Sequence, residues 1–291
     1  MSLEARFNVD DLVRLLDLES IEHNIYRGRN RDIGTGMIYG GQVLAQALVA
    51  AQRTVDADRP VHSMHGYFIL AGDLTLPVVY FVDRLRDGGS FATRRVTAIQ
   101  HGKAIFNMSA SFQKREEGLQ HGAQMPDVPP PEDLVSELDV IRAHRDEIPE
   151  RLRDTITQDR PLDIRPVDPV NPFSADSHPP KRCLWVRAQG QLDDNPLTHQ
   201  AVLAYASDYG LLVTSLRPHA MTFRDPKLMV ASLDHSIWFH RPFRADEWLL
   251  YEVDSPVAEG GRGFTRGTYF SRDGHVVASV AQEGLIRVRS R

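Results

Sequence analysis

The sequence is poor in cysteine and has no long apolar run. Cys183 is the only cysteine among 291 residues, so an internal disulfide and a cysteine-based zinc site are both excluded. Residues 43–51 form the longest apolar helix candidate, but Gln46 interrupts them, and they fall far short of the roughly 20 residues that cross a bilayer. The first ten residues show no basic region followed by an apolar stretch, as a secretory signal would require. We therefore expect a cytoplasmic protein that does not enter a membrane.

Charge of one sign is not in large excess either. Lys and Arg number 34 against 39 Asp and Glu, a net charge of −5, which argues against a nucleic acid or an anionic membrane as the main partner. The 12 histidines lack the His-Glu-x-x-His spacing of metal-ligating pairs, so neither a metal nor another cofactor is expected. Hydrophobic residues make up 42% and charged residues 25%, as in soluble globular proteins. The length suits one large domain or two fused halves.

What the sequence does contain is an internal repeat. Three pairs of segments carry it: 62–64 (His-Ser-Met) with 235–237 (His-Ser-Ile), the glycine pair 88–89 with 260–261, and the apolar helical segment 43–47 with 202–206. The first two pairs lie 173 and 172 residues apart, and the helical pair lies 159 residues apart. Two copies of one helix-plus-sheet unit therefore follow each other along the chain.

Each copy is predicted to place an apolar helix among antiparallel strands. In the first copy we predict helices at 10–21 and 42–53 and strands at 61–70, 77–85, 90–99 and 103–113, with turns at 86–89 and 101–102. In the second copy, Asn195 caps and Pro196 opens a helix that runs to about Tyr209, where Gly210 ends it. Strands of the second copy are predicted at 183–188, 227–241, 247–253, 263–271 and 275–288.

The segment between the copies differs in composition. It holds the proline run 129–131 and a dense set of charges from 132 to 159, which indicates a partly helical arm with a solvated face. A short helix is predicted at 141–152. The predicted organisation is therefore an N-terminal unit, 1–113, a linker or crossing arm, 114–181, and a C-terminal unit, 182–291.

Asp208 becomes a candidate functional residue when the two apolar helices are aligned, because it falls opposite Val49. The carboxylate interrupts a helix that is otherwise built to be buried. It also lies near the helix C-terminus, where the macrodipole disfavours a negative charge. A residue that is doubly unfavourable for stability is a candidate for function. The alternative is that Asp208 protrudes at a frayed helix end and caps the following turn, and the sequence leaves both open.

Ser232 and Gln282 are weaker candidates when each is taken alone. Strand alternation places Ser232 and Asp234 on one face of a strand and His235 on the other. A serine in a half-buried strand is typically exposed to solvent, and a buried glutamine typically bonds to a neighbouring backbone. His62 and His235 hold matching repeat positions, which favours a shared structural role over catalysis.

Five segments together resemble the acyl-CoA thioesterase II family. They are 203–208 (Leu-Ala-Tyr-Ala-Ser-Asp), 232–243 (Ser-Leu-Asp-His-Ser-Ile-Trp-Phe-His-Arg-Pro-Phe), 280–284 (Val-Ala-Gln-Glu-Gly), 40–43 (Gly-Gly-Gln-Val) and 87–91 (Asp-Gly-Gly-Ser-Phe). The resemblance runs from about residue 13 to residue 286 and weakens through the linker. It implies an α+β fold, a double hotdog in which each half wraps an antiparallel sheet around a central helix. It also implies a catalytic triad, which falls on Asp208, Ser232 and Gln282.

The activity that the resemblance implies is hydrolysis of fatty acyl-CoA thioesters to free acid and CoA, a reaction of fatty acid and lipid metabolism. Asp208 would draw a proton from a water that Ser232 and Gln282 orient. The backbone N–H groups of Gly40 or Gly41, at the start of a helix, are candidates for binding the oxyanion and substrate. The alternative is that these glycines only permit a tight turn.

Two other functions stay open. A hotdog hydratase or dehydratase acting on enoyl or hydroxyacyl thioesters needs an acid–base pair that usually includes histidine, and none is assigned near Asp208. A non-catalytic acyl-CoA-binding homologue is disfavoured by the three polar residues. A serine-hydrolase mechanism lacks the Gly-x-Ser-x-Gly elbow. Acyl-CoA is the expected partner, and the resemblance implies a homodimer or homotetramer.

Overall fold

A computed structural model of the chain describes residues 7–34, 36–222 and 225–289, so the outer ends of the first and last predicted units lie outside the described part. The first half contains α1 (Val9–Leu16), β1 (Glu19–Glu22), β2 (Ile25–Gly28), α2 (Gly40–Gln52), β3 (Val61–Phe68), β4 (Val78–Asp87), β5 (Phe91–Gln100) and β6 (Lys103–Gln113). The connection contains η1 (Pro131–Asp133), α3 (Glu137–Ala143), η2 (Arg145–Glu147), α4 (Glu150–Thr157) and β7 (Leu162–Pro166). The second half contains β8 (Lys181–Ala188), α5 (Pro196–Ser207), α6 (Leu211–Leu216), η3 (Arg217–His219), β9 (Leu228–Ser232), β10 (Asp234–Phe239), β11 (Leu249–Glu259), β12 (Arg262–Ser271) and β13 (Val276–Val288).

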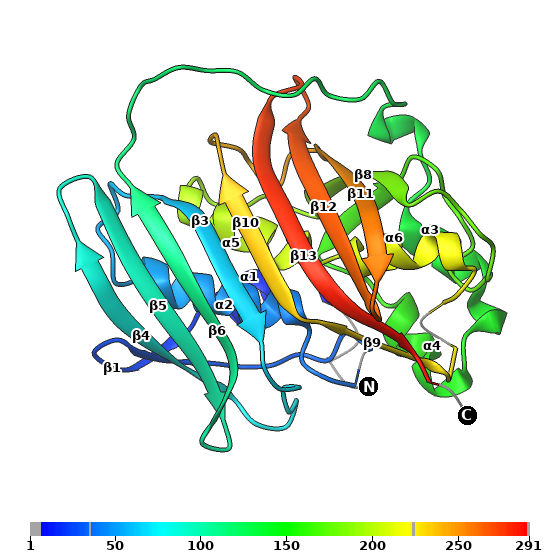
Figure 1. Ribbon diagram of the computed structural model, residues 1–291, viewed down its shortest axis with the longest axis horizontal. Helices are drawn as coiled ribbons and strands as arrows, with labels where there is room; N and C mark the ends of the chain where they lie inside the picture. The colour runs from blue at the N-terminus through cyan, green and yellow to red at the C-terminus, as the bar shows by residue number, and fades with distance from the viewer. Residues whose placement is uncertain (1–6, 35, 223–224, 290–291) are drawn as a thin grey trace.

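One antiparallel sheet runs through both halves. Within the described residues it has 13 strands, in the order β1-β2-β4-β5-β6-β3-β10-β13-β12-β11-β8-β7, with β9 also paired to β13. The halves join where β3 pairs with β10, with Met64 opposite Ile237. This pairing removes an exposed edge from each half-sheet. Figure 1 shows the sheet crossing the whole molecule with α2 and α5 behind it.

The two central helices lie against each other in opposite directions. The end of α2 meets the start of α5, where Gln52 Nε2 donates to Gln200 Oε1 at 3.4 Å. At the other end, a β carbon added to Gly41 would collide with the carbonyl of Tyr205. Glycine is therefore required at this position so that the two helices can approach each other closely.

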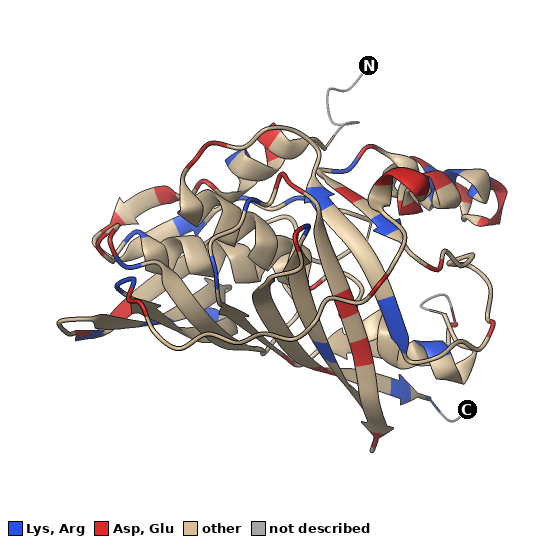
Figure 2. Cartoon of the chain, turned by 90° about the horizontal axis from the view of Figure 1, so that it is seen from above, with Lys and Arg blue, Asp and Glu red and all other residues tan. Residues whose placement is uncertain are grey.

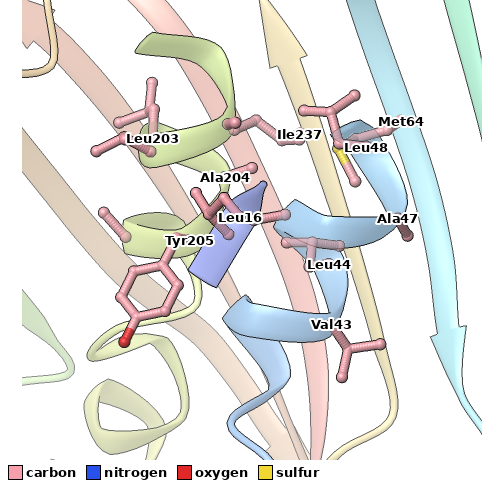
Figure 3. Packing of buried hydrophobic residues seen from close by; sticks show 14 of the residues in the cluster. Leu16, Val43, Leu44, Ala47, Leu48, Met64, Leu203, Ala204, Tyr205 and Ile237 are labelled. Atoms are coloured by element: carbon pink, nitrogen blue, oxygen red, sulfur yellow. The ribbon is translucent and has the colours of Figure 1, made fainter. Parts of the chain in front are cut away.

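The core lies between this helix pair and the sheet. Figure 3 shows Leu44 and Leu48 of α2 beside Met64 of β3, with Ala204 of α5 and Ile237 of β10 in the same cluster. All five side chains are 2% exposed or less. Neither α2 nor α5 carries a charged Asp, Glu, Lys or Arg, as expected for helices buried on most sides. Figure 2 shows that α3 and α4 in the connection carry many charges instead.

The connection between the halves differs from its prediction. The predicted helix at 141–152 is wrong as one element, because the chain forms α3, the short turn η2 and then α4. Pro149 explains the break, since the residue before a proline is disfavoured in helical conformation, and Pro149 itself caps α4. The strand β7, which was not predicted, pairs with β8 and extends the sheet. Figure 1 shows the start of the connection passing over the top of the sheet from β6 to the far side of the second half.

Apart from the predicted strand 227–241, which the structure divides into β9 and β10, the other predicted elements agree with the structure except at their ends. The predicted helix at 10–21 stops at Leu16, because 19–22 forms β1 instead. The turn at 101–102 is a tight hairpin with positive φ at His101 and Gly102. No helix of the described residues has the length and apolar character that crossing a membrane needs.

Candidate active site

Asp208 lies at the point where α5 ends and α2 begins. It is the C-cap of α5, and Gly210 then adopts a left-handed conformation with φ 81°, which turns the chain out of the helix. The Asp208 side chain is only 6% exposed. A β carbon at Gly40 would lie 2.7 Å from its Oδ2 atom, so glycine is required for the carboxylate to reach this position. The alternative of a frayed, solvent-exposed helix end is therefore wrong.

The structure brings Ser232 and Gln282 to the same carboxylate. The Gln282 amide, the Ser232 hydroxyl and the backbone N–H of Gly41 lie beside the Asp208 carboxylate, and each of these donors acts to lower its pKa. Gln282 is 1% exposed, and its Nε2 atom also donates to Ser232 Oγ at 2.6 Å. Three residues from α5, β9 and β13 thus form one connected polar group.

A β-bulge places Ser232 in this group and corrects the predicted strand. Ser232 pairs with Gly284 and Ser236 pairs with Ala281. The chain therefore advances four residues from Ser232 to Ser236 while the partner strand β13 advances three. The extra residue divides the predicted strand 227–241 into β9 and β10 and reverses the alternation of side chains. The prediction that Ser232 shares a face with Asp234 is therefore wrong. Asp234 instead accepts the backbone N–H of Glu283 at 2.7 Å.

His235 belongs to this polar group, although its matching repeat position predicts only a structural role shared with His62. The ring is fully buried, with Nδ1 3.1 Å from Gln282 Oε1 and Nε2 2.8 Å from Ser207 Oγ. Burial lowers the pKa of His235 to about 4, so the ring is neutral. With its proton on Nδ1 it donates to Gln282 Oε1, which turns the Gln282 amide nitrogen toward Ser232 and Asp208. Residue types do not indicate a bulge. Regular strand alternation therefore predicts the wrong face for His235, whose side chain lies on the same face as Ser232.

The surroundings of Asp208 favour its neutral form. Burial raises the pKa of Asp208 to about 7, although the hydrogen bonds from Gln282, Gly41 and Ser232 act in the opposite direction. A carboxylate that titrates near neutral pH can accept a proton during a reaction and return it afterwards. Asp208 is therefore the side chain of this site best suited to act as a general base.

Gly40 and Gly41 open α2 directly beside Asp208. Neither residue has a positive φ, so the alternative that they permit a tight turn is not supported. Both are required by close packing instead, Gly40 against Asp208 and Phe68, and Gly41 against Tyr205. The N-terminus of α2 therefore lies beside the carboxylate, with the N–H of Gly41 next to it. Within the described part of the chain, no three His, Cys, Asp or Glu side chains are grouped so that they can hold a metal ion.

The arrangement of the two halves defines a class of protein. Each half wraps its part of the antiparallel sheet around one central helix, and the fused pair is a double hotdog. A conserved protein with a hot dog fold from Alicyclobacillus acidocaldarius has the same architecture, with a TM-score of 0.76 at 19% identity over 95% of this chain and 97% of that one. The predicted fold is confirmed.

Comparison with known proteins then gives the family. A family model described as acyl-CoA thioesterase matches residues 151–285, and one described as acyl-CoA thioesterase N-terminal domain matches residues 28–113. Acyl-CoA thioesterase 2 of Haemophilus influenzae is 40% identical, over 96% of this chain and 98% of that protein. The crystal structure of the acyl-CoA thioesterase II TesB2 from Mycobacterium marinum is 43% identical, with a TM-score of 0.77 over 95% of this chain and 98% of that one. The chain belongs to the acyl-CoA thioesterase family, a family of thioester hydrolases, and the resemblance noted from its sequence is confirmed.

Proposed function

We propose that this protein hydrolyses fatty acyl-CoA to a free acid and CoA by general base catalysis, with Asp208 as the base. The observation that carries the proposal is the buried carboxylate with a pKa of about 7, held by an amide, a hydroxyl and a helix N-terminal N–H. In this assignment Ser232 and Gln282 orient the attacking water. General base assistance of this kind is worth ~10²–10⁴-fold in rate.

The reaction is balanced by one proton that Asp208 accepts and returns. Water attacks the thioester carbonyl carbon while Asp208 takes a proton from it, and a C–O bond forms. The tetrahedral intermediate then collapses, the C–S bond breaks, and the proton passes from Asp208 to the departing CoA sulfur. The products are the free acid and the CoA thiol, with Asp208 ionised again.

The oxyanion of the intermediate needs hydrogen-bond donors that are already in place. The N–H of Gly41 lies beside Asp208 and lowers its pKa, so this N–H stabilises the ionised base. The N–H of Gly40 stands one residue earlier, at the first position of α2, where the helix dipole favours a negative charge. We therefore assign oxyanion binding to Gly40 and positioning of Asp208 to Gly41.

The rival mechanisms fit these contacts less well. A serine nucleophile activated by histidine is not supported, because Ser232 Oγ accepts from the amide of Gln282, which separates it from His235. The base beside the Ser232 hydroxyl is Asp208. A hydratase that uses histidine as its acid or base needs a ring that can change its protonation. His235 has both nitrogens engaged with Gln282 and Ser207 and a pKa of about 4. A binding protein without turnover has no need of a buried carboxylate that titrates near pH 7.

Thiol release from saturated acyl-CoAs of several chain lengths, followed with a thiol reagent, tests the proposal. We expect stoichiometric release of CoA and of free acid. Reversible hydration of enoyl-CoA without thiol release would support the hydratase instead, and binding without either reaction would support the non-catalytic homologue.

The oligomeric state, the cellular location and the boundaries of the units are also proposals. We infer a homodimer or homotetramer in the cytoplasm, and units at 1–113, 114–181 and 182–291. Light scattering coupled to size-exclusion chromatography measures the mass of the assembly directly, and limited proteolysis measures whether cleavage concentrates in 114–181.

A further inference from the structure

The residue that follows Asp208 is anchored to the connection between the two halves. The Tyr209 hydroxyl donates a hydrogen bond to Glu137 Oε2 and accepts one from Arg160 Nη1 at 3.0 Å. Glu137 is the first residue of α3, and Arg160 follows the end of α4. Both belong to the arm 114–181, whose charges are predicted from the sequence to lie on a solvated face. These two charged side chains instead contact the residue next to Asp208.

The groups that hold the Tyr209 hydroxyl are themselves fixed. The side chains of Glu137 and Arg160 are 17% and 24% exposed, and Arg160 Nη1 lies 3.4 Å from Glu137 Oε2. The other carboxylate oxygen of Glu137 pairs with Arg182 of β8 at 3.7 Å, and Arg160 Nη2 donates to the carbonyl of Ile156 at 3.2 Å. Burial, and next the charge of Glu137, raise the pKa of Tyr209, so the phenol keeps the proton that it donates. Hydrogen bonds to charged groups that are shielded from water are strong, so this contact can hold the chain.

Asp208 lies at a position where a helix gives little support of its own. It is the C-cap of α5, and Gly210 leaves the helix with φ 81°. Helix ends fray, because their last backbone groups lack the regular intrahelical partners. The backbone N–H of Tyr209 reaches back to the carbonyl of Ala206 at 3.0 Å, a span of three residues in place of the regular four. The side-chain anchor of Tyr209 therefore fixes the chain directly after the base.

The copy of the repeat that lacks the base also lacks this anchor. The spacing of 159 residues relates Asp208 to Val49 and Tyr209 to Ala50. Ala50 has no hydroxyl and is fully buried, and α2 continues past both positions to Gln52. In α5 the helix ends at the matching place, and the tyrosine contacts the arm. The base and its anchor thus occur together in one half of the repeat.

We propose that Glu137 and Arg160 are positioning residues for the hydrolysis. By holding the Tyr209 hydroxyl, they fix the end of α5 that presents the Asp208 carboxylate to the reacting water. This inference rests on the proposed role of Asp208 as the general base. A displacement of about 1 Å from the reacting geometry can cost about 10²-fold in rate. The arm therefore supports catalysis through Tyr209, in addition to connecting the two halves.

Tyr209→Phe in the full chain tests the proposal, because it removes the hydroxyl, keeps the ring and changes no charge. We expect kcat for thiol release to fall by about tenfold or more, with KM within about twofold of its original value. The pH midpoint of kcat should also move below 7, since a displaced carboxylate loses part of the burial that raises the pKa of Asp208 to about 7. The other titratable groups that face Asp208 are unchanged in this variant: Tyr39, Tyr205, Tyr251 and His235. A merely structural role would lower the thermal midpoint and leave the pH midpoint in place.

Glu137→Ala removes the acceptor of the same hydroxyl, so it should change kcat and the pH midpoint in the same directions. The double variant should be no slower than Glu137→Ala alone, because both changes break one contact. Asp154→Ala is the matched control. It removes another carboxylate of the arm, which pairs with Arg145 at 3.0 Å, and it should leave kcat, KM and the pH midpoint unchanged. If Glu137→Ala does not fold, Tyr209→Phe decides the question by itself.

Asp208→Asn, measured beside these variants, separates the positioning role from the general base. If Asp208→Asn has low turnover while Tyr209→Phe keeps a normal kcat or an unmoved pH midpoint, the positioning role is overturned and the general base stands. Near-normal turnover of Asp208→Asn would overturn the general base and the positioning role with it. Losses of kcat that multiply in the double variant, or that also appear in Asp154→Ala, would show that Glu137 does not act through Tyr209.

Discussion

The two ends of the α2–α5 pair have related backbones and different chemistry. At one end Asp208 meets the glycines that open α2, and at the other end Gln52 of α2 donates to Gln200, near the start of α5. A buried carboxylate destabilises a fold unless hydrogen-bond donors surround it, and the Asp208 end provides an amide, a hydroxyl and a backbone N–H that do so. In this duplicated fold, a buried carboxylate therefore lowers the stability at only one end of the α2–α5 pair.

The paired histidines show the same divergence. His62 is partly exposed and its Nε2 lies 2.8 Å from Ser111 Oγ. His235 is fully buried and bonds to Gln282 and Ser207. The residue type was kept in both halves, but only the bulge before His235 joins it to a buried polar group. A repeated residue therefore does not imply a repeated role.

The largest expected effect comes from removing the base at the Asp208 end. Asp208→Asn should lower kcat at least ~10²-fold, because an amide cannot accept the proton from water. Thiol release under saturating acyl-CoA measures this, with circular dichroism as the check on folding. Asp234→Asn is the matched control, since its oxygen can still accept the Glu283 N–H, and it should keep near-normal turnover. Equal turnover of Asp208→Asn and Asp234→Asn would show that Asp208 is not the general base.

The pH dependence of the rate should report the carboxylate directly. Because the pKa of Asp208 is raised to about 7 and the base acts when ionised, kcat should rise about tenfold per pH unit below pH 7 and level off above it. A pH profile of thiol release measures the midpoint. A midpoint near pH 4 would mean that another group limits the rate.

Loss of the amide should cost turnover more than substrate affinity. Gln282→Ala removes the donor to Ser232 and Asp208 and leaves the Nδ1–H of His235 without its acceptor. We expect kcat to fall by about tenfold or more with a smaller change in KM. Steady-state kinetics separates the two constants, and an effect on KM alone would contradict an orienting role for this amide.

The smallest expected effects concern stability, and here the two ends should respond in opposite directions. Folded Asp208 holds its proton up to about pH 7, whereas the unfolded chain loses it near pH 3.8. Its contribution to stability is therefore full below pH 3.8 and is lost as the pH rises to about 7. Asp208→Asn should be the more stable form at pH 8, by on the order of a few kcal/mol, and the gain should vanish below pH 4.

The mirror-image change should do the reverse. Val49→Asp puts a carboxylate into the half-buried packing at the Gln200 end without the surrounding donors, so it should lower the thermal midpoint by a few degrees at pH 8. It should create no second active site, and thiol release should be unchanged. Thermal unfolding of both variants at pH 4 and pH 8 checks the pair. An unaltered midpoint for Val49→Asp would mean that the two helices are aligned incorrectly.

Much of the fold could be predicted because it depends on local rules. Apolar period and capping located α2 and α5, with Asn195 and Pro196 opening α5 as expected. The strands of both hairpins followed from alternation and glycine turns. The missed elements are short ones, such as β1 and α6, whose few residues give too little periodicity. Pro149 marks the break before α4 in the sequence itself, because the residue before a proline is disfavoured in a helix.

The site was predictable in part. Asp208 was found from the sequence because it is an exception within an apolar helix. The faces of Ser232 and His235 were not, because one extra residue at Leu233 reverses the pleat after it. The register of a bulge depends on the partner strand β13, which lies about 50 residues away in the chain, and local sequence contains no measure of it.

The sequence by itself determined the duplicated unit, the apolar helices and the polar residue types available to each half, because these depend on composition and spacing. Only the tertiary structure decided which of those residues meet. The opposed directions of α2 and α5 brought the N–H groups of one half to the carboxylate of the other. Burial among them raised the pKa of Asp208 to about 7, since desolvation is a property of the packed surroundings and not of the residue.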